Sequence, residues 1–477
     1  MAKIYIVVKK KMLKKVKIAM QSRKNDVLTY SQVFLSSKNY VSKKIYAERR
    51  KSLMKKLDSF CVFAGMPVEP GGEEAFVQTW TRFVQDPAFL YMTGVNQAGC
   101  YLVLDPRNSC STLFVPRKDP FKEFWNGKRL GFVDGDKGIA RLTGIDEVRP
   151  VDELWDTVQA LSETYGAGES AVDHAYAFFY EKFKGDHNEK LKNDMKKVLR
   201  RYKMKVKSCA DLHFEDRLVL EPERIVDARV AQQITDEAFR ALLPAMKNMK
   251  TERDAALFLN YEMQRRGDGD LAFPTIAAGG NNACCLHYVK NDEALRDGEL
   301  VLFDFGVRFG TLHSDISRTI PVNGKFDPLQ RMLYEIVLES AKVYQRVVRP
   351  GVSLKEIGMI CWEFIMMELS RRLVKGAKGR YKLLYEKRPH GVSHFIGEHI
   401  HEGDPGSRSL DVVLKPGMLI SCEPGIYGDF SATIDGKRYS ESIGIRIEDD
   451  LLITKNGFEN ISRNIPREVD EIEALMR

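Results

Sequence analysis

The segment Leu300-Val301-Leu302-Phe303-Asp304-Phe305-Gly306 decides how this chain is organised. It is an apolar run that ends in a glycine, which is typical of a buried strand that delivers one carboxylate. Asp315 follows after a gap of ten residues, at the start of a second predicted strand over 316–322. Because the gap contains Gly306 and Gly310, the chain can turn back, and we expect both carboxylates to face one cavity.

Two neighbouring carboxylates in the interior of a protein are costly, because like charges repel strongly where the dielectric constant is low. A pair of divalent metal ions would remove that cost. Taken alone, Asp304 and Asp315 are equally well explained as solvent-facing or salt-bridged aspartates. The triplet Asp304-Phe305-Gly306 also occurs in protein kinases, but no glycine-rich loop or His-Arg-Asp loop accompanies it here.

Three later segments carry further potential ligands. Four of the nine histidines fall within residues 390–401, among them His394, although a lone histidine is more often a core residue than a ligand. Glu423 precedes Pro424-Gly425, so the strand predicted at 418–422 ends there and leaves Glu423 at its terminus. Residues 442–452 alternate between apolar and polar, which places Arg446 and Glu448 on one face of a predicted strand. A half-exposed, salt-bridged edge strand would give the same alternation.

Together these segments offer four carboxylates and one imidazole. If the fold brings them together, they can hold two divalent ions that share and activate one water for hydrolysis. The candidate ligands, in chain order, are Asp304, Asp315, His394, Glu423 and Glu448.

The five motifs, in this order and spacing, resemble metallopeptidases of the pita-bread class, and most of all the aminopeptidase P (Xaa-Pro aminopeptidase) family. The resemblance covers Tyr46 to Met476 and is strongest from Pro274 to Asp450. It implies an α/β N-terminal domain and an α+β, creatinase/aminopeptidase-like catalytic domain of the pita-bread fold. The expected division is a basic extension over 1–45, the N-terminal domain over 46–215 and the catalytic domain over 216–477.

The resemblance also implies roles for single residues. All five candidate ligands would hold a dinuclear centre, and Glu423 would in addition move the proton. Oxygen-rich ligation with one imidazole suits Mn²⁺, which the family also favours, while Co²⁺ and Zn²⁺ remain compatible. The further catalytic groups implied are His287, His390 and His401, and the substrate-binding groups are Tyr427 and Arg446. His399 has no role in the motif, and His313 and Leu410 depart from the family pattern in ways that bear on substrate preference.

The implied reaction is hydrolysis of the bond between an N-terminal residue and a following proline. The implied partners are peptides with proline in the second position, and the family suggests a homodimer or homotetramer. A prolidase, which cleaves only Xaa-Pro dipeptides, is the nearest alternative, and a methionine aminopeptidase fits poorly because the N-terminal domain is large. A non-catalytic binding protein on the same fold would usually have lost ligands that are all present here.

Length and charge limit the other possibilities. A chain of 477 residues exceeds the usual size of a single core, so two domains are expected. The net charge is +8, but residues 1–56 hold 17 Lys and Arg against two acidic residues, and the rest holds 57 against 64. The body is therefore mildly acidic, and we expect no nucleic-acid partner. No apolar run approaches the length of about 18 residues that a membrane span requires, so no membrane partner is expected.

The cysteines and the N-terminus bear on the compartment. The eight cysteines form no Cys-x-x-Cys pair and suggest no disulfide framework, which favours the cytoplasm. An organelle matrix is the alternative if the Lys- and Ser-rich residues 1–45 are a transit peptide rather than a disordered tail.

Periodicity and capping signals predict the elements that carry these motifs. A helix over 252–266 would begin after Thr251 and end before Gly267. A second over 354–372 starts with Ser353-Leu354-Lys355-Glu356, which matches a capping box. Other predicted elements are helices at 47–57 and 228–246 and strands at 60–64, 100–104 and 112–115.

Overall fold

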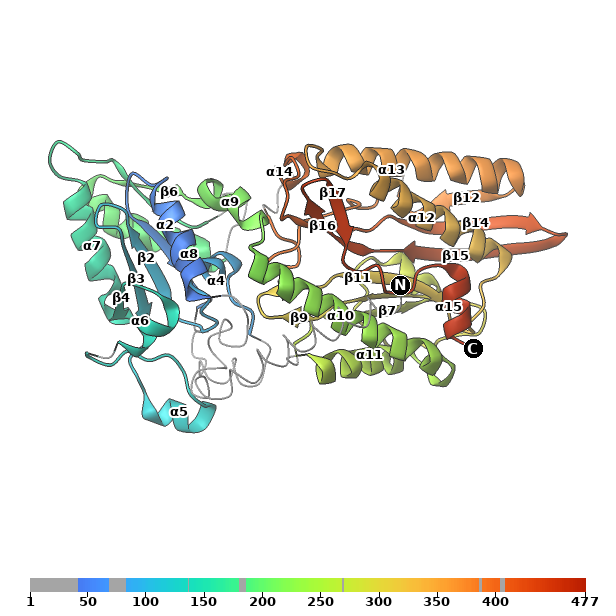
Figure 1. Cartoon of the computed structure of the whole chain (residues 1–477), viewed down its shortest axis with the longest axis horizontal. Helices are drawn as coiled ribbons and strands as arrows, with labels where there is room; N and C mark the ends of the chain where they lie inside the picture. Colours follow the sequence, from blue (N-terminus) through green and yellow to red (C-terminus); the bar gives the residue numbers. More distant parts are fainter. Residues whose placement is uncertain are drawn as a thin grey trace, which may run out of the picture. The chain divides into compact units, whose positions relative to one another are not determined.

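The structure is a computed structural model, and it describes residues 42–67, 83–135, 137–179, 186–267, 270–385, 388–403 and 408–477. The chain forms two compact units, Met1–Leu212 and His213–Arg477 (Figure 1). Apart from its last four residues, the extension predicted over 1–45 lies outside the described part. No helix in that described part is long and apolar enough to cross a membrane.

The N-terminal unit is built on a six-stranded mixed sheet in the order β4-β3-β2-β1-β5-β6. The three central strands β1, β2 and β3 pair antiparallel, and the outer strands join them in parallel. Apolar clusters cover both faces of the sheet, as expected for an α/β domain. The strands are β1 (Cys61–Ala64), β2 (Tyr101–Asp105), β3 (Cys110–Val115), β4 (Glu147–Pro150), β5 (His174–Ala177) and β6 (Lys205–Ser208).

The helix predicted at 47–57 is α2, and it spans Lys43–Met54. It begins earlier because Ile45 and Tyr46 extend its buried face. Its arginines are buried as well: Arg49 donates a hydrogen bond to the carbonyl of Tyr91 (2.9 Å), and the next arginine donates to that of Met92 (2.9 Å). The other helices of this unit are α4 (Pro87–Thr93), α5 (Pro120–Asn126), α6 (Gly138–Thr143), α7 (Leu154–Tyr165), α8 (His187–Leu199) and α9 (Ala210–Leu218), the last crossing the boundary.

The C-terminal unit contains three antiparallel sheets of three strands, in the orders β11-β8-β7, β12-β14-β15 and β13-β16-β17, and a short hairpin β9-β10. The strands are β7 (Ile276–Gly279), β8 (Leu300–Phe305), β9 (Arg308–Phe309), β10 (Leu312–His313), β11 (Ile316–Pro321), β12 (Arg380–Leu383), β13 (Leu419–Cys422), β14 (Gly425–Ile434), β15 (Lys437–Arg446), β16 (Asp449–Thr454) and β17 (Gly457–Asn460).

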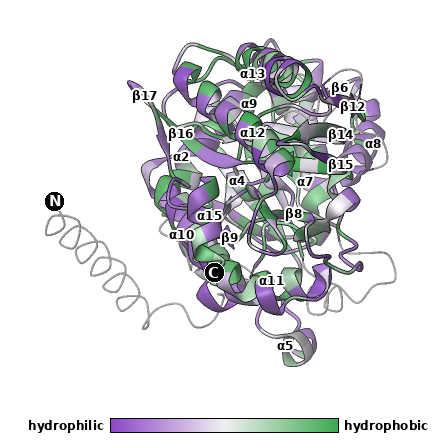
Figure 2. Cartoon of the chain, turned by 90° about the vertical axis from the view of Figure 1, so that its right-hand side faces the viewer, coloured by the Kyte–Doolittle hydropathy of each residue, from purple (hydrophilic) through white to green (hydrophobic). Residues whose placement is uncertain are grey.

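Helices enclose these strands from two sides. Figures 1 and 2 both show α10 and α11 on one side and α12 and α13 on the other, and Figure 2 shows hydrophobic and hydrophilic residues interspersed along α12. One apolar core joins all four helices to the strands, which gives the α+β arrangement expected of the pita-bread fold. The helices are α10 (Pro222–Ala245), α11 (Glu252–Arg266), α12 (Pro328–Val347), α13 (Leu354–Glu368), α14 (Arg408–Asp411) and α15 (Val469–Leu475).

Local signals predicted some elements well and others less well. Helix α11 has the predicted bounds, and its cap Thr251 accepts a hydrogen bond from the amide of Asp254 (3.1 Å). Helix α13 starts at the predicted residue with the predicted capping box, in which Ser353 is the N-cap and Glu356 the third helical residue. Its α-helical part ends at Glu368, and residues 369–376 follow in π-helical conformation. Helix α10 starts six residues before the predicted 228, with Pro222 in its first turn.

The single strand predicted over 442–452 is wrong. The chain leaves β15 after Arg446 and enters β16 at Asp449, which belongs to a different sheet. Between them the amide of Glu448 donates to the carbonyl of Ser317 on β11 (3.0 Å). Glu448 therefore sits where three sheets approach one another, a position that alternation within one strand does not reveal.

Candidate metal centre

The antiparallel pair β8 and β11 brings the two aspartates together. Asp304 lies opposite Ser317, and Asp315 is the residue just before β11. The hairpin β9-β10 fills the predicted gap, and the turn requires glycine at two positions. A Cβ at Gly306 would lie 1.9 Å from the carbonyl oxygen of Ser314, and Gly310 has φ +68°.

Backbone hydrogen bonds hold the other ligand segments against this pair. The amide of His394 donates to Ser421 Oγ (3.0 Å), and the amide of Ser421 donates to the carbonyl of His394 (2.9 Å). The amide of Glu423 donates to the carbonyl of Val392 (2.9 Å). With the bond from Glu448 to β11, the four segments converge on one point although they lie far apart in the sequence.

The ligand atoms form overlapping triads. In each of two triads the ligand atoms lie within 4.8 Å of one another: His394, Glu423 and Glu448 in one, and Asp304, Asp315 and Glu448 in the other. Because Glu448 belongs to both, the arrangement fits two adjacent cations with one bridging carboxylate. A third triad joins His401 to Asp315 and His394.

His394 presents the correct nitrogen to the carboxylates. Its Nδ1 lies 3.1 Å from the carbonyl of Phe395, so this nitrogen carries the proton and Nε2 is left as a lone-pair donor. Nε2 lies 3.4 Å from Asp315 Oδ2, 3.5 Å from Glu423 Oε1 and 3.8 Å from Glu448 Oε1. Three carboxylates around one imidazole lone pair form a typical metal-ligand set.

The electrostatics of the centre also indicate cations. Burial, followed by the neighbouring carboxylates, raises the pKa of Asp315 and of Glu448 well above the usual range. Burial raises the pKa of Asp304 as well, against the opposing effect of Arg446. Among the described residues, no hydrogen-bond partner is found for the buried atoms Asp304 Oδ1 and Glu448 Oε1. Buried carboxylate oxygens that have no hydrogen-bond donor are suited to binding divalent cations.

Tyr427, Arg446 and His390 form a hydrogen-bonded chain beside the carboxylates. Arg446 Nη2 donates to Asp304 Oδ2 (2.6 Å), its Nη1 donates to the Tyr427 hydroxyl (3.2 Å), and its Nε donates to Ser317 Oγ (2.7 Å). His390 Nδ1 lies 2.6 Å from the carbonyl of Gly391, so its Nε2 accepts from Tyr427 (3.1 Å). Burial raises the pKa of Tyr427 to about 12, so the hydroxyl keeps its proton.

The remaining predicted residues lie at the rim. The His401 ring centroid is 4.4 Å from that of His394. His399 Nδ1 contacts the backbone of His401, and the His399 amide donates to Glu402 Oε2 (3.2 Å), which agrees with a loop role. His287 is exposed, and it lies near enough for its charge to act toward lowering the pKa of Asp304 and of His390.

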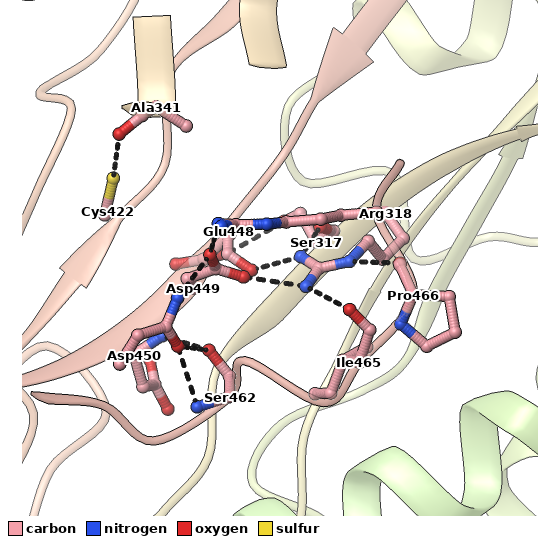
Figure 3. Close-up of polar contacts among 12 residues, drawn as sticks. Ser317, Arg318, Ala341, Cys422, Glu448, Asp449, Asp450, Ser462, Ile465 and Pro466 are labelled. Carbon is pink, nitrogen blue, oxygen red and sulfur yellow. Dashed lines mark hydrogen bonds and ion pairs between the residues drawn. The ribbon is translucent and has the colours of Figure 1, made fainter. Parts of the chain in front are cut away.

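Sequence reasoning missed the buried residues that hold Glu448 in place (Figure 3). The guanidinium of Arg318 is fully buried and donates to Asp449 Oδ1 (2.7 Å) and to the carbonyls of Ser317 (2.9 Å) and Glu448. It also donates to the carbonyls of Pro466 (2.8 Å) and Ile465 (3.3 Å).

Asp450 supports the other side of the centre. Its Oδ2 accepts from the amide of Asp315 (3.1 Å) and from Gln232 Nε2. The only sequence signal for these positions is the run of three acids from Glu448 to Asp450, which is unusual next to a buried strand.

Comparison with known proteins agrees with this arrangement. The C-terminal unit matches the model of metallopeptidase family M24 over residues 227–455, and residues 46–167 match the aminopeptidase P N-terminal domain. The fold and the carboxylate-rich centre thus define an M24 metallopeptidase, a hydrolase.

Comparison with individual relatives identifies the family within the M24 metallopeptidases. Xaa-Pro aminopeptidase 3 of Rattus norvegicus is 35% identical over 82% of this chain and 76% of its own length, and Xaa-Pro aminopeptidase of Escherichia coli is 31% identical over 91% and 98%. The zinc-substituted E. coli aminopeptidase P in complex with product superposes with a TM-score of 0.74 at 28% identity, over 91% of this chain and 98% of that one. The chain belongs to the Xaa-Pro aminopeptidase (aminopeptidase P) family. Xaa-Pro dipeptidase of Mus musculus is a more distant relative, 29% identical over 87% of this chain and 89% of its own length.

Proposed function

We propose that this chain removes the first residue from peptides whose second residue is proline, using two divalent ions. The observation that carries the proposal is the pair of ligand triads that share Glu448. His394 and Glu423 complete one cation position, and Asp304 and Asp315 complete the other. When bound, the ions supply Lewis-acid polarisation of the scissile carbonyl and a water of lowered pKa.

Glu423 is the proposed general base and then general acid. Its Oε2 lies 3.7 Å from His390 Nδ1, while its Oε1 accepts a hydrogen bond from Ser421 Oγ (3.3 Å). This carboxylate stands at the end of β13 and is only partly exposed, so it can receive a proton from water and pass it to the leaving proline nitrogen.

His390 and His401 flank the centre, and we assign them different roles. Both ring nitrogens of His390 are engaged, by Gly391 and by Tyr427, so His390 positions the Tyr427 hydroxyl at the substrate side. His401 stacks edge-on against His394, and we assign it the contact to the oxyanion that develops on the scissile carbonyl. Arg446 neutralises part of the carboxylate charge through Asp304 and holds Tyr427.

The direct test uses a tripeptide of the form Xaa-Pro-Yaa. We expect release of the first residue by protein reconstituted with Mn²⁺, none after treatment with a chelator, and recovery when Mn²⁺ is restored. Cleavage of the dipeptide Xaa-Pro alone would support a prolidase instead. A protein that binds two ions per chain but cleaves neither peptide would be a binding protein on the same fold.

Mn²⁺ is the proposed ion because four of the five ligands are carboxylates and hard oxygen donors prefer such cations. Metal analysis of protein purified without added metal is the test: two equivalents of manganese support the proposal, and zinc in their place refutes it.

The compartment and the oligomer are further proposals of the same kind. All eight cysteines are thiols in the structure, and we propose a reducing compartment, the cytoplasm. An N-terminus that begins at Met1 in protein recovered from cells would support this, and removal of the basic extension would instead indicate an organelle matrix. A homodimer or homotetramer is expected, and light scattering of the purified protein gives the number of chains.

A further inference from the structure

We propose that a positively charged face beside the candidate centre favours peptides with acidic residues on the C-terminal side of the proline. The face consists of Arg380 and Lys382 on β12 and Arg438 on β15, and we call it the cationic face. The inference rests on the proposed aminopeptidase function and specifies the substrate class of the same site.

Strand register places the cationic face on the same side of the sheet as Tyr427. On β14, Tyr427, Asp429 and Ser431 project to one side because side chains alternate along a strand. Lys382 pairs with Asp429, and Arg380 pairs with Ser431. Paired residues share a face, so both cations lie in line with the substrate-side tyrosine.

The connection between β12 and the centre is direct. The amide of Leu384, which follows β12, donates to the carbonyl of Tyr427 (3.1 Å). Arg438 on β15 pairs with Thr433, which lies on the same side of β14 as Tyr427, and so extends the face outward. All three cations are exposed.

Among the described residues, no acid forms an ion pair with the cationic face. In the described part of the chain, no carboxylate lies within 4.0 Å of Arg380, Lys382 or Arg438. The acid that shares this face is Asp429, and its Oδ1 accepts a hydrogen bond from Ser442 Oγ (2.5 Å). Counted over the described residues, one acid against three cations leaves this face with a net positive charge that can attract a carboxylate of a ligand.

The length of the substrate decides which part of it reaches the face. A strand rises about 3.3 Å per residue, so Lys382 and Arg380 stand about 7 and 13 Å from Tyr427 along the sheet. The N-terminal side of the scissile bond holds one residue only, and an extended residue spans about 3.5 Å. Only the part of the peptide that follows the scissile bond can therefore lie over the cationic face. Counted from the peptide N-terminus, residues four to six then lie opposite the two cations.

Three peptides of equal length test the preference. Each begins Ala-Pro-Ala, and positions four and six are Glu in the first, Gln in the second and Lys in the third. An exposed ion pair changes binding by a factor of about two to five. With two such pairs we expect kcat/KM for the Glu peptide to exceed that for the Lys peptide about tenfold at low salt, and the ratio to fall in 0.5 M salt.

Substitutions test whether the cationic face causes the preference for acidic peptides. In the double variant Arg380→Gln, Lys382→Gln, the ratio should fall to about two or less, while kcat/KM for the Gln peptide stays within about twofold of the wild-type value. The matched control is Lys455→Gln, because this exposed lysine lies at the turn between β16 and β17, in a different sheet, and should leave the ratio unchanged.

Each result of these cleavage experiments bears on the inference or on the proposed function. Equal cleavage of the Glu and Lys peptides by the wild-type protein would overturn the inference and leave the aminopeptidase function intact. A preference that survives in the double variant would show that other groups cause it, which also overturns the inference. Failure to cleave even the Gln peptide would remove the proposed function and this inference with it.

Discussion

Replacing Arg318 by lysine should loosen the candidate centre although the substitution keeps the positive charge. The guanidinium of Arg318 is fully buried and donates to five acceptors, among them Asp449 Oδ1 and the carbonyl of Glu448. A lysine ammonium has three donors and no planar fork, so at least two buried acceptors lose their hydrogen bonds.

The expected loss of unfolding free energy follows from the number of hydrogen bonds that the lysine cannot make. A hydrogen bond to a charged donor contributes about 1.5–3 kcal/mol, so two of them amount to roughly 3–6 kcal/mol. We expect the lower end of this range, because one of the five contacts, to the carbonyl of Ile465, is long at 3.3 Å. Disturbance of residues that hold a metal ligand typically lowers metal affinity about 10–100-fold, and we expect a loss of that size here.

The assay has two readouts and one matched control. Chemical denaturation gives the stability of the C-terminal unit, and titration with Mn²⁺ gives the affinity. Arg331→Lys is the control, because Arg331 is 42% exposed, pairs with Glu335 and Asp470 at the surface, and should change stability by less than about 1 kcal/mol. If Arg318→Lys were as stable as the control and bound metal equally well, the reasoning about the buried network would be refuted. Normal affinity in a destabilised protein would show that Arg318 supports the fold but not the centre.

Three further predictions follow from single positions. Asp304→Asn should bind fewer than two ions and lose activity, with an unchanged circular dichroism spectrum; full activity would contradict its role as a ligand. Gly306→Ala should destabilise the C-terminal unit by about 2 kcal/mol or more in a denaturation experiment, because the new Cβ would meet the Ser314 carbonyl oxygen at 1.9 Å, and an unchanged midpoint would contradict this. Hydrogen bonds from Arg371, and then from Arg372, lower the pKa of Glu368 to about 2. Glu368 therefore stabilises the fold above pH 4.5, and this contribution is lost as the pH falls toward 2. Glu368→Gln should therefore cost about 1 kcal/mol at pH 7 and almost nothing near pH 2, and a difference that does not depend on pH would contradict the ion pair.

Local sequence signals predicted the elements whose causes are themselves local. The cap at Thr251 and the strand that delivers Asp304 depend on neighbours within a few residues, and both were predicted correctly. The strand through Glu448 was predicted wrongly, because its interruption depends on a hydrogen bond to Ser317, 131 residues away in the chain. Arg318 could not be distinguished from a surface arginine, since most of its acceptors come from two distant segments, residues 448–449 and 465–466. The motifs predicted which residues meet, whereas the residues that hold them in place emerge only from packing.

The charge of the centre argues for two ions rather than one. Asp304, Asp315, Glu423 and Glu448 contribute four negative charges when ionised, and Arg446 offsets one of them. A single divalent ion would leave the buried cluster negative, which would keep the pKa of Asp315 and Glu448 raised and oppose ionisation of a bound water. A second ion makes the cluster slightly positive, and that sign stabilises a hydroxide and the negative charge that develops on a scissile carbonyl. Hydrolysis should therefore rise with occupancy of the second site, so that titrating metal into the depleted protein gives little activity up to one equivalent and most of it between one and two. Full activity at one equivalent would contradict this account of the charge.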